Sequence, residues 1–284
     1  MAALGPLLES WTHEGTVRIE TGSAQPDLVE LAGDSDAVLV IGDRNRAPRT
    51  VLPGAVLQSA CGRIVPAGWL PDTGPEALRR FATCAAAVHA RARGSRRTLA
   101  VLSQRQSRFG ALADKVVRLV EEERSDVMAC RWTAYDVHRD DLAIRLSRGP
   151  ALGVYLGHGR PIGWVGYAGL RARHIGQQVD PAWLPAGAVL SLTCKTASRR
   201  NTGLSFAESM PLNGVAAATL GAVGPTLHTD NARWAVRIVR ILPRVETVGE
   251  LIAEVAAADP AAGTFRLVGD PTAPLRDDPN FCTD

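Results

Sequence analysis

Short apolar runs alternate with amphipathic stretches along most of the chain. Runs rich in Val, Leu, Ile and Ala predict buried strands at residues 36–42, 98–103, 127–132, 152–157, 188–193, 215–220 and 264–268. Between them, helical spacing predicts helices at residues 75–93, 109–123, 136–148, 203–212, 232–242 and 247–258. Strands that alternate with helices predict an α/β fold, with a mostly parallel sheet and helices on both faces.

The first 35 residues follow this pattern poorly. Residues 16–21 alternate between polar and apolar positions and predict an exposed strand, and the rest of residues 1–35 is polar or broken by Pro and Gly. We therefore expect an N-terminal extension over residues 1–35 and one folded domain over residues 36–284. A chain of 284 residues is long enough to bury the core of such a domain.

Composition narrows the class of protein. The net charge of +3 is spread along the chain, which disfavours nucleic acid as a partner, because phosphate binding needs a concentrated basic face. No apolar stretch approaches the roughly 20 residues that span a bilayer, and no signal peptide is visible. The five cysteines are odd in number and widely spaced, so neither a disulfide framework nor a zinc site is indicated. These features favour a cytoplasmic protein without a membrane partner.

Two of the apolar runs end in reactive side chains. Residues 152–157 lead directly into His158, and residues 188–193 lead into Cys194. Open α/β sheets bind ligands beyond the carboxyl ends of their strands, so we expect these two side chains side by side at that edge. A cysteine at the end of a strand can also be an inert core residue. The chain turns polar directly after Cys194, however, and the neighbouring Lys195 would favour a thiolate.

The motifs around these residues resemble those of one family. They are, in order, VYLGHG (154–159), LSLTC (190–194), FAE (206–208), the small-residue strand 215–220 with GAVG (221–224), and LVGDPT (267–272). Together they resemble the catalytic half of the gingipain-like cysteine peptidases of the caspase-like (clan CD) superfamily. The resemblance covers about residues 36–275 and implies a caspase-like three-layer sandwich.

The resemblance also implies a Cys-His dyad. Cys194 takes the place of the nucleophile and His158 that of the general base, while the backbone N–H groups of Gly159 and Cys194 face the developing oxyanion. The thiolate attacks a peptide carbonyl, an acyl-enzyme forms, and water releases the product. This chemistry needs no metal or organic cofactor. Its partner is a protein or peptide substrate, and a regulatory protein is a further expected partner.

Four residues in the loops and helix after these strands are predicted to bind substrate: Arg160, Trp164, Asp230 and Trp234. For Trp234 a plain core position is an equal alternative. An acidic lining would favour cleavage after a basic residue, and an arginine lining would favour cleavage after an acidic one. The resemblance favours a basic residue before the scissile bond.

Two carboxylates need separate interpretation. Asp114 is a candidate for orienting His158, with a backbone carbonyl as the alternative, although a helix carboxylate beside Lys115 is usually solvated. Asp270 precedes Pro271, and this pair predicts a turn cap rather than a catalytic group.

Two other functions remain open from the sequence. One is a latent or non-catalytic caspase-like module that acts by protein binding and retains His158 and Cys194. The other is a flavodoxin-like protein that binds a small molecule.

Overall fold

A nine-stranded sheet forms the centre of the computed structural model, which describes residues 2–20, 28–33, 35–43, 54–123, 126–177, 179–257 and 259–281. The strand order is β1 (Val38–Asp43), β3 (Ile64–Asp72), β11 (Phe265–Gly269), β10 (Ala216–Ala222), β9 (Ala186–Leu192), β6 (Leu152–Leu156), β4 (Arg97–Ser103) and β5 (Val127–Thr133). Strand β2 (Val56–Gln58) pairs with β3. Apart from the antiparallel pairs β10–β11 and β2–β3, neighbouring strands are parallel, so the prediction of a mostly parallel sheet is confirmed.

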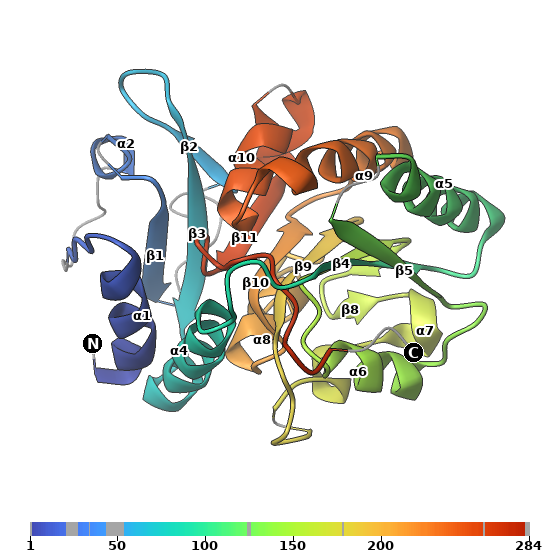
Figure 1. Cartoon of the computed structure of the whole chain (residues 1–284), viewed down its shortest axis with the longest axis horizontal. Helices are drawn as coiled ribbons and strands as arrows, with labels where there is room; N and C mark the ends of the chain where they lie inside the picture. The colour runs from blue at the N-terminus through green and yellow to red at the C-terminus, as the bar shows by residue number, and fades with distance from the viewer. Residues whose placement is uncertain are drawn as a thin grey trace.

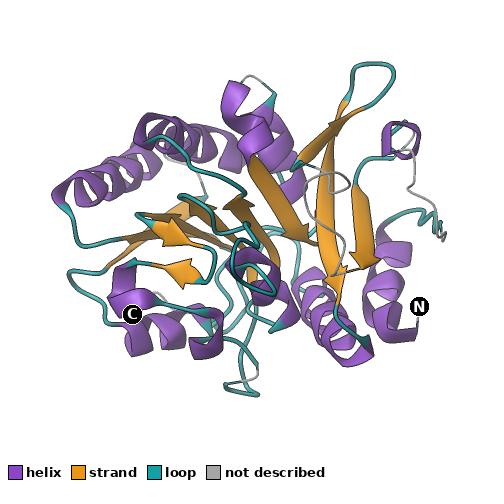
Figure 2. Cartoon of the chain, turned by 180° about the vertical axis from the view of Figure 1, so that it is seen from behind, coloured by secondary structure: helices purple, strands orange, loops and turns teal. Residues whose placement is uncertain are grey.

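Helices cover both faces of this sheet (Figure 1). One layer contains α5 (Ser107–Glu123), α9 (His228–Ile241) and α10 (Val248–Ala256), and the other contains α1 (Gly5–Glu14), α4 (Pro75–His89), α6 (Arg139–Leu146) and α8 (Phe206–Leu212). The view from behind shows the same two layers of helices on either side of the strands (Figure 2). The expected three-layer sandwich is therefore confirmed.

Shorter elements decorate these layers. They are α2 (Leu28–Leu31), the one-turn α7 (Gly166–Gly169), the hairpin of β7 (Gly159–Arg160) and β8 (Gly163–Trp164), and 3-10 turns at Ala2–Leu4, Ala172–His174, Leu242–Arg244 and Pro260–Thr264. No helix in the described ranges has both the length and the apolar character needed to cross a bilayer.

The central strands are buried on both faces because successive residues point to opposite helix layers. In β4, Leu99 and Val101 belong to the same apolar cluster as Val116 of α5. Ala100 and Leu102 belong to the cluster that contains Phe206 and Met210 of α8 and Leu142 and Leu146 of α6. This two-sided burial explains why the strand sequences read as continuous apolar runs rather than as alternating ones.

Several predicted elements differ from the observed ones. Strand β3 extends over Ile64–Asp72 although the sequence indicated no strand of this length there, because Pro66 and Pro71 interrupt its pattern. The predicted strand at 16–21 is wrong for residues 16–20, which have no regular structure, and residue 21 lies outside the described residues. Helix α9 begins at His228 rather than at residue 232, because its first turn, His-Thr-Asp-Asn, is polar and carries no apolar spacing.

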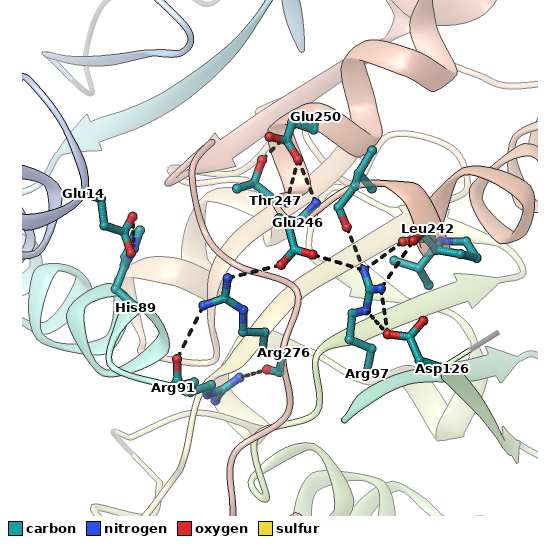
Figure 3. Close-up of polar contacts among 12 residues, drawn as sticks. Glu14, His89, Arg91, Arg97, Asp126, Leu242, Glu246, Thr247, Glu250 and Arg276 are labelled. Atoms are coloured by element: carbon teal, nitrogen blue, oxygen red, sulfur yellow. Dashed lines mark hydrogen bonds and ion pairs between the residues drawn. The ribbon is translucent and has the colours of Figure 1, made fainter. Parts of the chain in front are cut away.

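Residues 5–14 of the expected N-terminal extension form a helix that packs on the domain. Helix α1 contacts α4, and Leu7 is 1% exposed. The Glu14 carboxylate lies 3.0 Å from Nδ1 of His89, whose Nε2 lies 2.7 Å from Asp270 (Figure 3 shows the Glu14–His89 pair). Burial alone would lower the pKa of His89, but the two carboxylates raise it above its ordinary value. This polar chain joins α1 to the loop after β11.

Buried arginines anchor other segments to the sheet (Figure 3). Arg97 donates to the carbonyls of Leu242 (3.1 Å) and Val245 (2.8 Å) and pairs with Asp126 (2.7 Å). The carbonyl of Arg276 accepts a 2.6 Å hydrogen bond from Arg91 in the same region. These contacts all lie between structural elements, so we assign them to the stability of the fold.

Candidate active site

Strands β6 and β9 are neighbours, and they place His158 and Cys194 at equivalent positions. Leu156 pairs with Leu192, and each reactive residue follows two positions later. The Thr193 hydroxyl donates to the Gly157 carbonyl (2.7 Å), so the contact continues beyond the last paired residues. Neighbouring strands lie about 4.8 Å apart. The prediction that the two runs end side by side is therefore confirmed.

The backbone of His158 is fixed on both sides. Its N–H donates to the side-chain oxygen of Gln104 (2.8 Å), and its carbonyl accepts from the N–H of Val165 (2.9 Å) and the hydroxyl of Tyr155 (3.1 Å). Gln104 directly follows β4, the neighbour of β6. The imidazole thus projects into solvent from a rigid backbone.

Two residues of α5 contact the His158 ring. Arg108 donates from Nη2 to Nε2 of His158 (2.8 Å), and the ring of Phe109 meets the imidazole edge-on with centroids 5.3 Å apart. Partial burial and the positive charge of Arg108 lower the pKa of His158 below its ordinary value. The imidazole is consequently neutral over a wider pH range than a free histidine, as a general base requires.

The thiol of Cys194 is half-buried and has polar neighbours on the loop after β10. Its Sγ lies 3.4 Å from the N–H of Thr226 and 3.6 Å from both the carbonyl and the hydroxyl of that residue. The Thr226 hydroxyl in turn accepts from the buried amide of Asn231 (3.0 Å). A backbone N–H that points at sulfur stabilises a thiolate more than a thiol.

The chain turns sharply directly after Cys194. Lys195 has φ = 62°, which is uncommon for a residue with a side chain. The N–H of Lys195 donates to Gly224 (3.0 Å), and the N–H of Ala197 donates to Ala222 (2.9 Å). This turn ends the strand abruptly and leaves Cys194 at the edge of the sheet. Strained backbone of this kind often accompanies functional sites.

Gly159 brings the His158 segment onto the Cys194 segment. A Cβ atom at position 159 would lie 2.6 Å from the carbonyl oxygen of Cys194 and 2.7 Å from Cγ2 of Thr193. Only glycine allows this approach. The predicted oxyanion donors, the N–H groups of Gly159 and Cys194, therefore belong to two segments in direct contact.

The predicted substrate residues divide into two groups. Arg160 is exposed in β7 and free to meet a ligand. Asp230 is half-buried, and its carboxylate accepts from Arg233 (2.9 Å), which also binds Asp259. Trp164 is buried, so its expected contact with substrate needs correction. It stacks on Tyr155 of β6 with centroids 4.3 Å apart, and its indole N–H donates to the hydroxyl of Ser191 in β9 (2.8 Å).

Trp234 is also a core residue rather than a wall of the site. It is 0% exposed, and its ring lies 4.4 Å from that of Phe265 in β11. The alternative core interpretation of this tryptophan is therefore correct. Trp234 lies on the buried face of α9, together with Ala235 and Ile238.

Neither carboxylate considered in the sequence lies at the dyad. Asp114 pairs with Arg131 (2.7 Å), so its suggested contact with His158 is wrong. Asp270 accepts from the N–H (2.8 Å) and hydroxyl (2.7 Å) of Thr272, which confirms it as a turn cap. Among the described residues, no three His, Cys, Asp or Glu side chains gather in a way that could hold a metal ion.

Sequence reasoning missed the residues that surround the dyad from other elements. Arg108 and Phe109 approach His158, and Thr226 and Asn231 approach Cys194. The ring of Phe109 also meets that of His228 edge-on, with centroids 5.5 Å apart. The polar residues directly after strand 98–103 were a signal in the sequence for Arg108. Only the pairing of β4 with β6 shows that this segment reaches His158.

Comparisons with known proteins agree with this fold. Residues 99–276, more than half of the chain, match the model of Peptidase family C25. No curated protein matches the chain. The structure is similar to the complex of Porphyromonas gingivalis RgpB pro- and mature domains (16% identity, TM-score 0.63, 84% of this chain and 65% of that chain). It is also similar to the Arg-specific cysteine proteinase gingipain R (18% identity, TM-score 0.62, 86% of this chain and 65% of that chain).

A third similar structure is described as a protease (10% identity, TM-score 0.63, 95% of this chain and 67% of that chain). At these identities the likeness shows the fold. The chain spans 65% of the length of the two gingipain chains.

Proposed function

The chain belongs to Peptidase family C25, and we propose that it hydrolyses peptide bonds of a protein substrate through Cys194 and His158. The observation that carries this proposal is the pairing of β6 with β9, which puts an imidazole and a thiol at equivalent positions on one sheet edge. The N–H of Thr226 also donates to the sulfur (3.4 Å).

The proposed reaction uses these groups in turn. His158 accepts the proton of Cys194, and the thiolate attacks the peptide carbonyl carbon. The N–H groups of Gly159 and Cys194 stabilise the negative oxygen that develops. His158 then gives the proton to the leaving amine, and a water molecule, deprotonated by His158, releases the acid and restores the thiol.

The first test is cleavage of a mixed peptide library by the wild type, by Cys194→Ala and by His158→Ala. We expect cleavage by the wild type alone, with unchanged circular dichroism in all three proteins. Full activity in either variant would exclude the dyad.

Thiol labelling gives an independent readout, provided that Cys61 and Cys282, which lies outside the described residues, are removed first. Cys61 is exposed, and a hydrogen bond with Ser59 lowers its pKa, so it also reacts with iodoacetamide. Burial raises the pKa of Cys84 to about 12 and that of Cys130 to about 11. In a Cys61→Ser/Cys282→Ser background we therefore expect Cys194 to react first, and faster with a peptidyl acyloxymethyl ketone than Cys84 or Cys130.

One observation favours a latent resting state, the alternative function. Arg108 occupies the Nε2 lone pair of His158, so the base has no free lone pair at that nitrogen. A protein partner or a substrate that withdraws Arg108 would then switch the site on. Cleavage of peptides only after addition of a partner protein would support a latent module, and cleavage by the isolated protein would support a constitutive enzyme.

The resemblance favours a basic residue before the scissile bond, and Asp230 is the one acidic residue among the four predicted substrate residues. That carboxylate is already engaged by Arg233. Charge at the site is the better guide to substrate, and it is positive.

A further inference from the structure

Arg108 occupies an exposed position at the dyad. It is the second residue of α5, which follows β4, and β4 pairs directly with β6. Its guanidinium lies over the ring of Phe109, 4.6 Å from the centroid, and reaches Nε2 of His158. The Phe109 ring thus packs against one face of the guanidinium, and the exposed side chain keeps N–H groups available to a ligand.

Arg108 forms no ion pair with a carboxylate of the described residues. Within that part of the chain, its contacts are a neutral imidazole and an aromatic face. Its place in the first turn of α5 is electrostatically unfavourable, because the N-terminus of a helix is the positive end of the helix dipole. That turn contains no acidic residue. Neither helix stability nor ion pairing therefore accounts for an arginine here.

Other groups near the dyad strengthen the positive charge. Arg160 follows the predicted oxyanion donor Gly159 and is exposed, and Lys195 follows Cys194. The carboxylates on the neighbouring elements have arginine partners: Asp230 pairs with Arg233, and Asp114 and Asp136 share Arg131. A substrate that approaches Cys194 therefore meets a positively charged surface.

We propose that Arg108 binds the carboxylate of an aspartate or glutamate immediately before the scissile bond, so that this peptidase cleaves after acidic residues. The inference rests on the proposed function and assigns its substrate class. A guanidinium suits this role because it offers parallel N–H donors to both oxygens of one carboxylate.

Binding would also release the base. A carboxylate is a stronger acceptor for a guanidinium than a neutral imidazole, because both partners of the new hydrogen bonds are charged. Arg108 stays protonated and moves its N–H from Nε2 of His158 to the substrate oxygen. Nε2 regains its lone pair at the moment when a correct substrate is present. One residue thus links recognition of an acidic side chain to the freeing of His158.

The test uses peptides that are identical except for the residue before the scissile bond, which is Asp, Glu, Asn, Gln, Arg or Lys. We expect the wild type to cleave after Asp or Glu at least 10-fold faster, in kcat/KM, than after Asn or Gln. Arg108→Gln should lower kcat/KM for the acidic peptides by about 10- to 100-fold, as expected for the loss of a charged hydrogen bond. Arg118→Gln, an exposed change on the same helix, should leave the rates unchanged.

Two results would overturn the inference while leaving the proposed function standing. One is cleavage mainly after Arg or Lys by the wild type. The other is a preference for acidic peptides that survives in Arg108→Gln.

A binding measurement separates the inference from catalysis. Cys194→Ala protein is titrated with fluorescein-labelled peptides that contain a single Asp or a single Asn, and fluorescence polarisation reports binding. Tighter binding of the Asp peptide that is lost in Cys194→Ala/Arg108→Gln supports the acidic site even if no peptide is cleaved, in which case only the proposed function fails. Equal binding of the two peptides refutes the acidic site.

Discussion

Glu208 of the FAE motif offers the sharpest test of how the fold holds the loop after Cys194. It is 1% exposed, and both carboxylate oxygens are engaged. Arg199 donates from Nε to both oxygens (3.0 and 2.9 Å), and Trp69 of β3 donates from its indole (2.9 Å). Ser205 donates both its N–H and its hydroxyl (2.9 Å each). One buried carboxylate thus joins the loop, α8 and β3.

The chain contains its own control for this site. Ser205 and Glu208 form a capping box at the start of α8, and Thr247 and Glu250 form the same motif at the start of α10. Glu250 is exposed, and its carboxylate accepts only from backbone N–H groups of its own turn, at 2.7 Å (Glu246) and 3.1 Å (Thr247) (Figure 3). The two glutamates therefore differ in burial and in the arginine partner while sharing the helix position.

Glu208→Ala removes one partner of a buried ion pair and leaves the charge of Arg199 without its main counterion. Such losses cost about 3–5 kcal/mol. Glu250→Ala loses only exposed capping hydrogen bonds, which are worth about 1 kcal/mol. Since about 1 kcal/mol shifts Tm by roughly 2–4 °C in a domain of this size class, the two variants should differ by about 5–15 °C.

Urea unfolding followed by circular dichroism gives the two free energies, and thermal melts give the two Tm values. Equal losses in the two variants would refute the reasoning, because burial and the arginine would then contribute nothing. Burial alone would raise the pKa of Glu208, but Arg199, Ser205 and Trp69 hold it below its ordinary value. Its stabilising effect is therefore full above the ordinary pKa of glutamate and is lost as the pH falls through the lower pKa of the folded protein.

Four further changes have defined outcomes. In Gly159→Ala the added methyl group would lie 2.6 Å from the carbonyl oxygen of Cys194, so the two segments must move apart and kcat/KM should fall at least 10-fold. Unchanged kinetics would exclude the close approach. In Arg108→Gln, removal of a cation raises the pKa of His158, so the acid limb of the pH–kcat/KM profile should move to higher pH, and a fixed midpoint would contradict the contact. The carboxylates of Asp270 and Glu14 raise the pKa of His89, so the charged imidazole stabilises the fold at low pH. The loss of stability in His89→Gln, measured by urea unfolding at several pH values, should therefore be greatest at acidic pH and should shrink as the pH rises through the pKa of His89. Trp234→Phe should lower stability by about 1–3 kcal/mol through lost packing and leave KM unchanged, whereas a raised KM with normal stability would return this residue to the substrate site.

The sequence by itself determined seven of the sheet's strands and the two reactive positions. A parallel strand that is covered on both faces buries every residue, so it appears in the sequence as a continuous apolar run. Such a run can be recognised from neighbouring residues alone. The polar residue that ends each run marks where the chain leaves the core. His158 and Cys194 were located in this way, and the adjacency of their strands followed from the position of ligand sites in open sheets.

Local patterns were less informative where tertiary contacts override them. Prolines hid strand β3, which nevertheless pairs with β1, β2 and β11 in the sheet. The polar first turn of α9 hid the start of that helix. Trp164 and Trp234 follow the reactive strands in sequence, yet both rings turn into the core. The direction of a side chain depends on how its element packs, and sequence spacing alone does not contain that information.

Only the tertiary structure decided which charges meet at the site. Asp230 pairs with Arg233 because α9 begins at His228 rather than at residue 232, which puts the two residues three positions apart on one helix. Arg108 lies far from His158 in the sequence, and the strand order, with β4 beside β6, brings the two into contact. Contacts between different elements join residues whose separation along the chain follows no period, so the sequence specifies the reactive pair while the fold specifies the electrostatic field in which it works.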